Sequence, residues 1–435
     1  MNGIDFSRKE RTTIVLAVSI GNLLEWYEIY LYIYWAPIIS KLFFPHCSNI
    51  LGLIFTYLLF GLGFLARPIG GIFFGRLGDV IGRRKSLILS LLMMIFPTFV
   101  TGLLPTYKTI RHWAPAILGL MRFLQAFPAG GEMPGAACYL YESSRPDKRK
   151  FMSSWAPVGY QIGIWISTIE YFLMDRFLPK DALLTWGWRV SFLIGGLIGF
   201  FGLFLRYKLH ETPLYKEMLT HEKILKESLK EVFAKHGHAL IMGGFYCVLN
   251  SASFYLISVN FPMYFSRVFG ESSRFTLVIT ALLLLLITIP LPFFGVLAQR
   301  YNHKTIILTA TLITILLLFP LYHAMTIGSG LYMGLIMCAF CLLYACMSAI
   351  IPYIICELFP TYSRFTCVGV SFNFVDAVVG GFTPAITLLL YQATGNKGSI
   401  CWYLLVCACI SLYAYVKMRN RLHHKPYHHH QKTHH

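Results

Sequence analysis

Charged side chains are scarce in this sequence: they make up 13% of the 435 residues, whereas hydrophobic side chains make up 56%. A soluble globular protein needs far more charge on its surface, so the composition excludes that class. The apolar residues gather in runs of about 20, which is enough for a helix to cross the roughly 30 Å hydrocarbon core of a bilayer. Because these runs are continuous and do not alternate with polar residues, they predict helices and exclude a barrel.

The sequence motifs of common enzymes are also missing. There is no Walker loop, no G-x-S-x-G elbow and no H-E-x-x-H metal motif, so ATP hydrolysis and hydrolase chemistry have no visible residues. We therefore expect no enzymatic activity, no cofactor and no metal site.

The hydrophobic runs predict an all-α polytopic membrane protein with twelve transmembrane helices in two sets of six. The first set is expected near 12–38, 50–75, 86–106, 113–141, 151–175 and 187–206, and the second near 238–265, 274–297, 305–323, 328–351, 364–391 and 398–417. A polar stretch rich in Lys and Glu separates the two sets. We divide the chain into an N-terminal half (1–206), a cytoplasmic and partly helical linker (207–237), a C-terminal half (238–417) and a His-rich cytoplasmic tail (418–435).

Acidic residues are the rarer charge, with 19 Asp and Glu against 37 Lys and Arg. Most of the basic residues fall in segments on the side of the predicted bundle that holds the N-terminus. The positive-inside rule then places both termini in the cytoplasm. The basic residues lie in short loops beside helices, where anionic lipid attracts them, so we expect the bilayer as a partner and no nucleic acid.

A weak internal repeat supports two related halves. The segment from Gly75 to Lys85, after the second predicted helix, is echoed by Gly295 to Lys304 after the eighth. Parallel six-helix repeats are typical of transporters whose binding site lies between the halves near the bilayer midplane.

Six segments of the chain, in order, resemble the metabolite:H+ symporter branch of the major facilitator superfamily. They are Gly21–Glu28, Ala66–Gly71, Arg122–Glu132, Trp186–Arg189, Glu211–Pro213 and Glu357–Thr361. The branch includes permeases for proline and betaine, citrate, α-ketoglutarate and shikimate. The resemblance implies the major facilitator fold and a proton-coupled importer, and we expect a monomer in the cell inner (plasma) membrane. It also implies that a gating motif is formed by Gly75, Asp79, Gly82, Arg83 and Arg84.

Ionisable side chains within the predicted helices mark the expected site, because a charge at a helix centre is costly unless it faces a cavity or a partner. Glu25 and Glu28 lie three residues apart on one helix, and Asp376 lies on the eleventh. A carboxylate in a low-dielectric site can load and unload a proton near neutral pH. We predict that Glu28 or Glu25 carries the proton, with Asp376 as a third candidate. The alternative is a fixed ion pair.

Polar stripes on four helices predict the substrate site. Its candidate residues are Arg122, Gln125, Glu132, Tyr32, Asn250 and Asn373. Arg122 is the candidate to hold a substrate carboxylate, because a guanidinium binds such groups bidentately; the alternatives are helix-end packing for Arg122 and an ion pair with it for Glu132. Arg67 is expected near the inner leaflet, in a structural role.

The predicted substrate follows from a charge count. Four acids (Glu25, Glu28, Glu132 and Asp376) against Arg122 make the cavity acidic, which favours a zwitterion whose cationic end meets an acid. We predict proton symport of an amino acid or betaine-type osmolyte by alternating access. The alternatives are a symporter of a small mono- or dicarboxylate and a drug/H+ antiporter.

Overall fold

The computed structural model describes residues 7–220, 229–262, 273–327 and 330–419. Within these ranges every regular element is a helix, and the fold class predicted from the sequence is confirmed. The first half contains six long helices: α1 (Arg8–Phe43), α2 (Asn49–Ile81), α3 (Arg83–Leu103), α5 (Trp113–Glu142), α7 (Trp155–Phe177) and α9 (Trp188–Tyr207).

The second half repeats the pattern, with three of its helices interrupted. Its elements are α11 (Leu229–Tyr255) with η3 (Leu256–Asn260), α13 (Ser273–Thr288) with α14 (Leu291–Arg300), α15 (His303–Ile327), α16 (Gly330–Leu358), α17 (Arg364–Val375) with η4 (Asp376–Gly380) and α18 (Gly381–Thr394), and α19 (Ile400–Arg419). Short helices in the connections are α4 (Tyr107–Ile110), η1 (Pro146–Lys148), α6 (Arg149–Ser153), α8 (Lys180–Ala182), η2 (Leu183–Gly187), α10 (Pro213–Thr220) and η5 (Lys397–Ser399).

Ten helices of the described chain are long and apolar enough to cross a membrane. α5 and α7 are not among them, although they have 30 and 23 residues, because polar side chains such as Arg122 and Gln125 in α5 and Gln161 and Glu170 in α7 interrupt their apolar runs. Both pack inside the bundle, α5 against α2 and α7 against α1, so polar residues on their faces meet protein instead of lipid.

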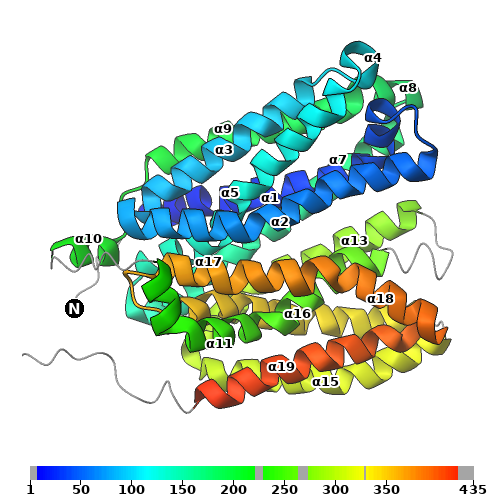
Figure 1. Ribbon diagram of the computed structural model, residues 1–435. Coiled ribbons are helices and arrows are strands. Elements are labelled where there is room, and N and C mark those ends of the chain that lie inside the picture. Colours follow the sequence, from blue (N-terminus) through cyan, green and yellow to red (C-terminus); the bar gives the residue numbers. More distant parts are fainter. Residues whose placement is uncertain (1–6, 221–228, 263–272, 328–329, 420–435) are drawn as a thin grey trace, which may run out of the picture.

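The two halves lie side by side in Figure 1, the first in blue to green and the second in green to red. We call the end of the bundle that carries the α2–α3 turn the loop-motif end. α1 begins there, and so does α10, which follows α9. The helices alternate in direction, so the described start and end of the chain share this end of the bundle (Figure 1).

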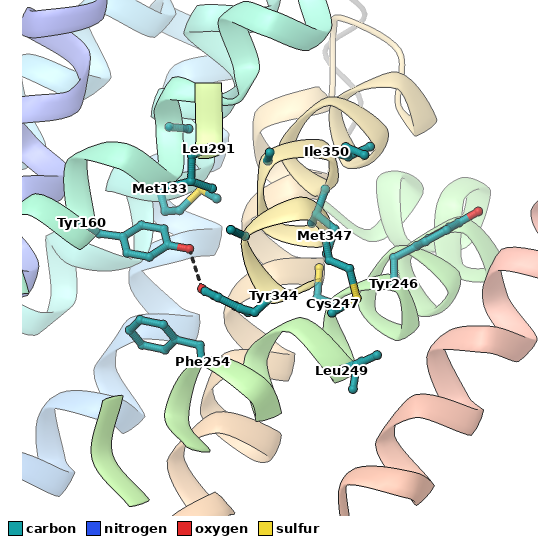
Figure 2. Close-up of a cluster of buried hydrophobic side chains, with 14 of the residues drawn as sticks. Met133, Tyr160, Tyr246, Cys247, Leu249, Phe254, Leu291, Tyr344, Met347 and Ile350 are labelled. Carbon is teal, nitrogen blue, oxygen red and sulfur yellow. Dashed lines mark hydrogen bonds between the residues drawn. The ribbon is translucent and has the colours of Figure 1, made fainter. Parts of the chain in front are cut away.

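A continuous apolar core joins the halves. Figure 2 shows part of it, with Met133 and Tyr160 of the first half facing Tyr344 of α16. The Tyr160 hydroxyl is 3.0 Å from the hydroxyl of Tyr344 and 2.9 Å from that of Ser348. Trp26 of α1 packs edge-on against Phe254 of α11 with ring centroids 4.8 Å apart. Aromatic packing and hydrogen bonds thus hold the two halves together midway along the bundle.

The helix bounds differ from the sequence prediction around the polar linker, where the hydrophobic pattern is weak. α11 begins at Leu229, nine residues before the predicted start at 238. α10 starts with Pro213, which is preorganised for the first helical position. Residues 221–228 of the predicted linker (207–237) and residues 420–435 of the predicted tail (418–435) lie outside the described residues.

Two wide π-helical turns lie in the second half. In η3 the N–H of Phe261 donates to the carbonyl of Leu256, and in η4 the N–H of Gly381 donates to the carbonyl of Asp376, five residues back in each case. Pro384 follows η4 and lacks the N–H that an α-helix would direct at the carbonyl of Gly380. Such turns are frequent at functional sites.

Candidate functional site

A buried cluster of three charged side chains lies at the interface between the halves. Arg67, on α2, has its Nη2 2.6 Å from Oε1 of Glu25 on α1 and its Nη1 3.7 Å from Oδ2 of Asp376 in η4. Asp376 also accepts hydrogen bonds from Ser251 at 3.1 Å and Tyr255 at 3.3 Å. One guanidinium therefore links two carboxylates from opposite halves.

Arg67 was expected near the inner leaflet, and this expectation was wrong. It lies near the middle of α2, and its guanidinium carbon is 5.3 Å from the ring centroid of Trp26 and 5.6 Å from that of Phe64. Cation–π contacts of this kind stabilise a desolvated guanidinium. Arg67 is thus a central member of the candidate site.

Glu28 and Arg122 line a second part of the site, inside the first half. Both face one small cavity, together with Glu25, Arg67 and Gln125. The cavity has about 20 Å³ of water-accessible space, which is room for about one water molecule.

Arg122 donates to Oε1 of Gln125 at 2.6 Å and stacks over the ring of Tyr32, 4.2 Å from its centroid. The structure thus brings together the predicted residues Glu25, Glu28, Arg122, Gln125 and Tyr32.

The buried charges of the described residues do not balance. Eleven charged side chains are buried, six carboxylates (Glu25, Glu28, Asp79, Glu132, Glu142 and Asp376) and five arginines (Arg67, Arg83, Arg122, Arg206 and Arg364). Among the described residues, neither Glu28 nor Arg122 has an oppositely charged partner within 4 Å, and Oε1 of Glu28 has no hydrogen-bond partner. The surplus carboxylate belongs to the Arg67 cluster, whereas Glu28 and Arg122, one acid and one base without an ion pair within 4 Å among the described residues, face the same cavity.

Glu132 was predicted to bind substrate, with an ion pair to Arg122 as the alternative. The structure pairs it with Arg206 of α9 instead: Oε2 lies 2.5 Å from Nη2 and Oε1 lies 2.9 Å from Nη1. Ser90 also donates to Glu132 at 2.6 Å. Both charged side chains are fully buried, so in this conformation Glu132 does not face the cavity. The sequence-based charge count changes accordingly, since Glu132 drops out and Arg67 enters, which leaves three carboxylates against two guanidiniums.

Asn373 and Asn250 lie in the second half, close to the charged cluster. The amide of Asn373 donates to the backbone carbonyl of Gly130 in α5 at 2.6 Å and to that of Gly369 at 2.8 Å. Asn373 thus connects the halves in this conformation. Asn250 is buried next to Ser251, and its Oδ1 has no hydrogen-bond partner among the described residues.

An aromatic cavity of about 300 Å³ adjoins the charged one. Ile29, Phe60 and Phe64 line both cavities. The aromatic cavity lies between the halves, with Trp26 and Tyr30 of α1 on one side and residues of η3, η4 and α18 on the other. It is large enough for a small metabolite and leads to the unpaired charges.

The residues of the predicted gating motif join the halves at the loop-motif end. The carboxylate of Asp79 accepts three hydrogen bonds from the start of α17: from the N–H of Phe365 at 3.2 Å and from the N–H and hydroxyl of Thr366 at 2.9 and 2.7 Å. The first N–H groups of a helix have no partner within the helix, and an anion there also meets the positive end of its dipole. An acid of the first half therefore caps a helix of the second.

Arg83 extends this contact into a network. It lies 3.1 Å from Asp79 and 2.9 Å from Glu142 of α5, and it also donates to the carbonyl of Thr361. Glu142 in turn binds Arg364 of α17 at 2.6 Å. Asp79, Arg83, Glu142 and Arg364 form a charge-balanced group that spans both halves.

The two glycines of the motif have separate roles. Gly82 has φ of +109°, a conformation that side chains rarely adopt. A Cβ on Gly75 would lie 2.7 Å from the Cα of Thr366, so Gly75 permits the close approach of α2 and α17.

Glu211, just before α10, fixes the start of α3. It accepts hydrogen bonds from the N–H groups of Arg83 at 3.0 Å and Arg84 at 3.1 Å, in place of the side-chain cap that Gly82 lacks. Burial raises the pKa of the Glu211 carboxyl, and hydrogen bonds from backbone N–H groups partly offset the effect. Arg84 donates to the carbonyl of Tyr207 at 2.8 Å and so ties α3 to α9.

Comparisons with known proteins agree with this arrangement. The family model of the Major Facilitator Superfamily matches residues 20–384. The chain is similar to a citrate-proton symporter of Klebsiella pneumoniae (32% identity, covering 93% of this chain and 91% of the relative) and to a proline/betaine transporter of Salmonella typhimurium (30% identity, 93% and 83%). Among solved structures, the proton:xylose symporter XylE bound to 6-bromo-6-deoxy-D-glucose superposes with a TM-score of 0.78 at 16% identity, covering 95% of this chain and 96% of that one.

Proposed function

This chain belongs to the major facilitator superfamily, and from that premise we propose that it imports a small, zwitterionic metabolite together with protons. The metabolite is an amino acid or a betaine-type osmolyte. Transport proceeds by alternating access, in which the halves rock about the site between them. A relative named for proline and betaine supports this substrate class, and one named for citrate makes a small carboxylate the second candidate.

The observation that carries the proposal is that Glu28, among the described residues, has no ion-pair partner within 4 Å. Glu28 faces the cavity with Arg122, which has no such partner among these residues either. An unpaired charge in a low-dielectric site is costly, so Glu28 takes up a proton when the site is closed to water. With one proton the central group of three carboxylates and two guanidiniums is neutral. Occlusion and proton uptake are thereby coupled.

A zwitterion fits the same two groups. Arg122 offers a guanidinium for the substrate carboxylate, and the acids offer partners for its cationic end. The aromatic cavity next to them accepts the apolar part of the molecule. The small volume around Glu28 and Arg122 implies that the substrate enters only after the halves have moved apart.

The orientation follows from the basic residues at the loop-motif end, which include Arg83, Arg84 and Lys85. By the positive-inside rule this end faces the cytoplasm. The protein then acts as a monomer in the inner membrane, with both termini in the cytoplasm. In this proposal the group of Asp79, Arg83, Glu142 and Arg364 holds the halves together on the cytoplasmic side in the present conformation.

Uptake into proteoliposomes tests the proposal. A labelled panel of proline, glycine betaine, other amino acids, citrate and α-ketoglutarate is offered with and without an inward proton gradient. We expect gradient-dependent accumulation of one zwitterion. Accumulation of a carboxylate alone would show that the substrate is a carboxylate and that transport is still proton symport. Proton-driven expulsion of a cationic dye would instead show that the protein is an antiporter.

Two variants separate coupling from folding. Glu28→Gln removes the carboxylate at this position, so we expect it to lose gradient-driven accumulation while it still exchanges internal for external substrate. Glu170→Gln is the matched control, because Glu170 accepts a hydrogen bond from Tyr27 at 2.5 Å outside the charged cluster. Accumulation by Glu28→Gln at the wild-type level would refute Glu28 as the proton carrier.

A further inference from the structure

We propose that a groove at the start of α1 is a specific binding site for an anionic phospholipid. The groove has a volume of about 500 Å³ and lies between α1 and the segment η1–α6–α7. It is separate from the central site, and no step of the transport proposal uses it. Both proposals, however, assign the loop-motif end of the bundle to the cytoplasmic side of the membrane.

Three cationic side chains line the groove: Arg8 and Arg11 of α1 and Lys148 of η1. None of them has a carboxylate within 4 Å among the described residues. Two described acids beside them in sequence are engaged elsewhere. Glu10 accepts the N–H of Ser7 at 2.8 Å as part of the α1 capping box, and Asp147 pairs with Arg145 at 3.1 Å. Among the residues that the structure describes, the groove therefore presents three positive charges with no counter-charge.

The body of the groove is apolar. Val15 and Leu16 of α1 face it, as do Phe151, Met152 and Trp155. Leu16 is 54% exposed although it lies two turns inside a membrane-spanning helix, so its natural contact is an acyl chain. Trp155 is half-buried at the start of α7, the level at which tryptophans commonly meet lipid headgroups.

The combination selects the ligand. A phosphate alone would satisfy the cations and leave the apolar body exposed to water, whereas a neutral lipid would cover the body and leave the cations unpaired. An anionic phospholipid satisfies both parts. The cytoplasmic leaflet, which this end of the bundle faces in the proposed orientation, is where anionic lipids concentrate.

The groove adjoins a contact between the halves. Lys150 of α6 donates to the carbonyl of Ala298 in α14 at 3.0 Å, and the amide of Gln299 donates to the carbonyl of Asp147. The segment that supplies Lys148 and Phe151 to the groove is thus the segment that touches the second half. A lipid in the groove would hold this segment in place.

Native mass spectrometry of the detergent-solubilised, full-length protein tests the proposal. The probes are phosphatidylglycerol and phosphatidylcholine of identical acyl chains. A basic residue near a membrane surface contributes about 1 kcal/mol, or about fivefold, to the attraction of anionic lipid. For the triple variant Arg8→Gln, Arg11→Gln and Lys148→Gln we therefore expect about a hundredfold weaker binding of phosphatidylglycerol and unchanged binding of phosphatidylcholine.

The control variant removes the same number of charges from the same end of the bundle, outside the groove: Lys85→Gln, Lys208→Gln and Lys216→Gln. An equal loss in both variants would overturn the proposal, because it would show attraction by the net charge of that end. Unchanged binding in the triple variant would overturn it as well. Only variants whose thermal unfolding temperature without added lipid equals that of the wild type are compared.

Two further arms distinguish the sources of the phosphate. Leu16 is exposed and is expected to contact an acyl chain. Leu16→Gln should therefore weaken the binding of phosphatidylglycerol and leave the binding of sn-glycerol 3-phosphate, which has no acyl chain, unchanged. If sn-glycerol 3-phosphate displaces the lipid at comparable concentration, the groove is a site for a soluble phosphate compound and the lipid proposal fails. Lipid binding that withstands this competitor and requires Leu16 supports it.

Discussion

Replacing Asp79 with asparagine should loosen the contact between the halves at the loop-motif end. The carboxylate accepts three hydrogen bonds from Phe365 and Thr366 with its two oxygens, and it lies 3.1 Å from Arg83. Asparagine has one acceptor oxygen and no charge. Its amide N–H₂ would face either Arg83 or the backbone N–H groups of α17.

The cost can be estimated from these contacts. A hydrogen bond to a charged group contributes about 1.5–3 kcal/mol, and the substitution removes at least one and weakens the others. We estimate a loss of about 2–4 kcal/mol from the closed arrangement relative to the open one. That corresponds to a change of roughly 30-fold to 1,000-fold in the ratio of the two states.

Hydrogen exchange of the peptide that contains Phe365 and Thr366 measures this change directly. Both amides lie in the first turn of α17 and have no acceptor within the helix, so Asp79 is what protects them. In Asp79→Asn their exchange should accelerate by about the same factor, while amides at the centre of α17 keep their protection.

Asp147→Asn is the matched control, because Asp147 carries its charge at the same end but pairs with Arg145 in an exposed position. Its expected effect on the α17 amides is negligible. Unchanged exchange of Phe365 and Thr366 in Asp79→Asn would refute the reasoning. Faster exchange along the whole bundle would also refute it, by showing general destabilisation instead of a local opening.

Three other substitutions have defined outcomes. Glu132→Gln leaves Arg206 buried without its charged partner, which should cost about 3–5 kcal/mol of stability and lower the thermal unfolding temperature. An unfolding temperature equal to that of the wild type would show that Arg206 finds another counter-charge. Gly82→Ala forces a side chain into a region of positive φ that is essentially restricted to glycine, at about 1–3 kcal/mol, and the same thermal scan should detect it. A scan identical to wild type would mean that the α2–α3 turn relaxes to negative φ. Tyr160→Phe removes the hydroxyl that is hydrogen-bonded to Tyr344 across the halves. The loss of about 1 kcal/mol should accelerate hydrogen exchange of the amides near Tyr344 by roughly fivefold. Unchanged exchange there would show that this hydrogen bond does not hold the halves together.

The helices could be predicted because hydrophobicity over about 20 residues is a strong local signal. Positions within a helix are also local, so the sequence alone groups Glu28, Arg122 and Gln125 on polar stripes, and in the structure all three line one cavity. The bounds failed where the signal is weak. α11 starts within a polar, charged stretch that resembles a linker, and its first turns extend beyond the apolar run.

Ion pairing could not be predicted in the same way, because it depends on the rotation and packing of helices far apart in sequence. Glu132 and Arg206 are separated by 74 residues, and Glu142 and Arg364 by 222. Arg67 was misjudged for this reason, since only the approach of η4 to α2 shows that it meets Asp376. No signal in the sequence indicated the pairing of Arg206, because an arginine near the end of a membrane helix commonly reaches the interface without an acidic partner.

The wide turn η4 determines the direction in which the rest of its helix faces. A π-helical turn accommodates one residue more than an α-helical turn would, and each residue of an α-helix turns the chain by about 100°. Deleting one residue between Asp376 and Gly380 would rotate all of α18 by that angle. Thr387, bonded to Asn260 of η3 in the present structure, would then point to another side. The two π turns thus act as single-residue insertions in their own helices. The residues that follow each turn therefore face a direction about 100° away from the one that an uninterrupted α-helix would give them.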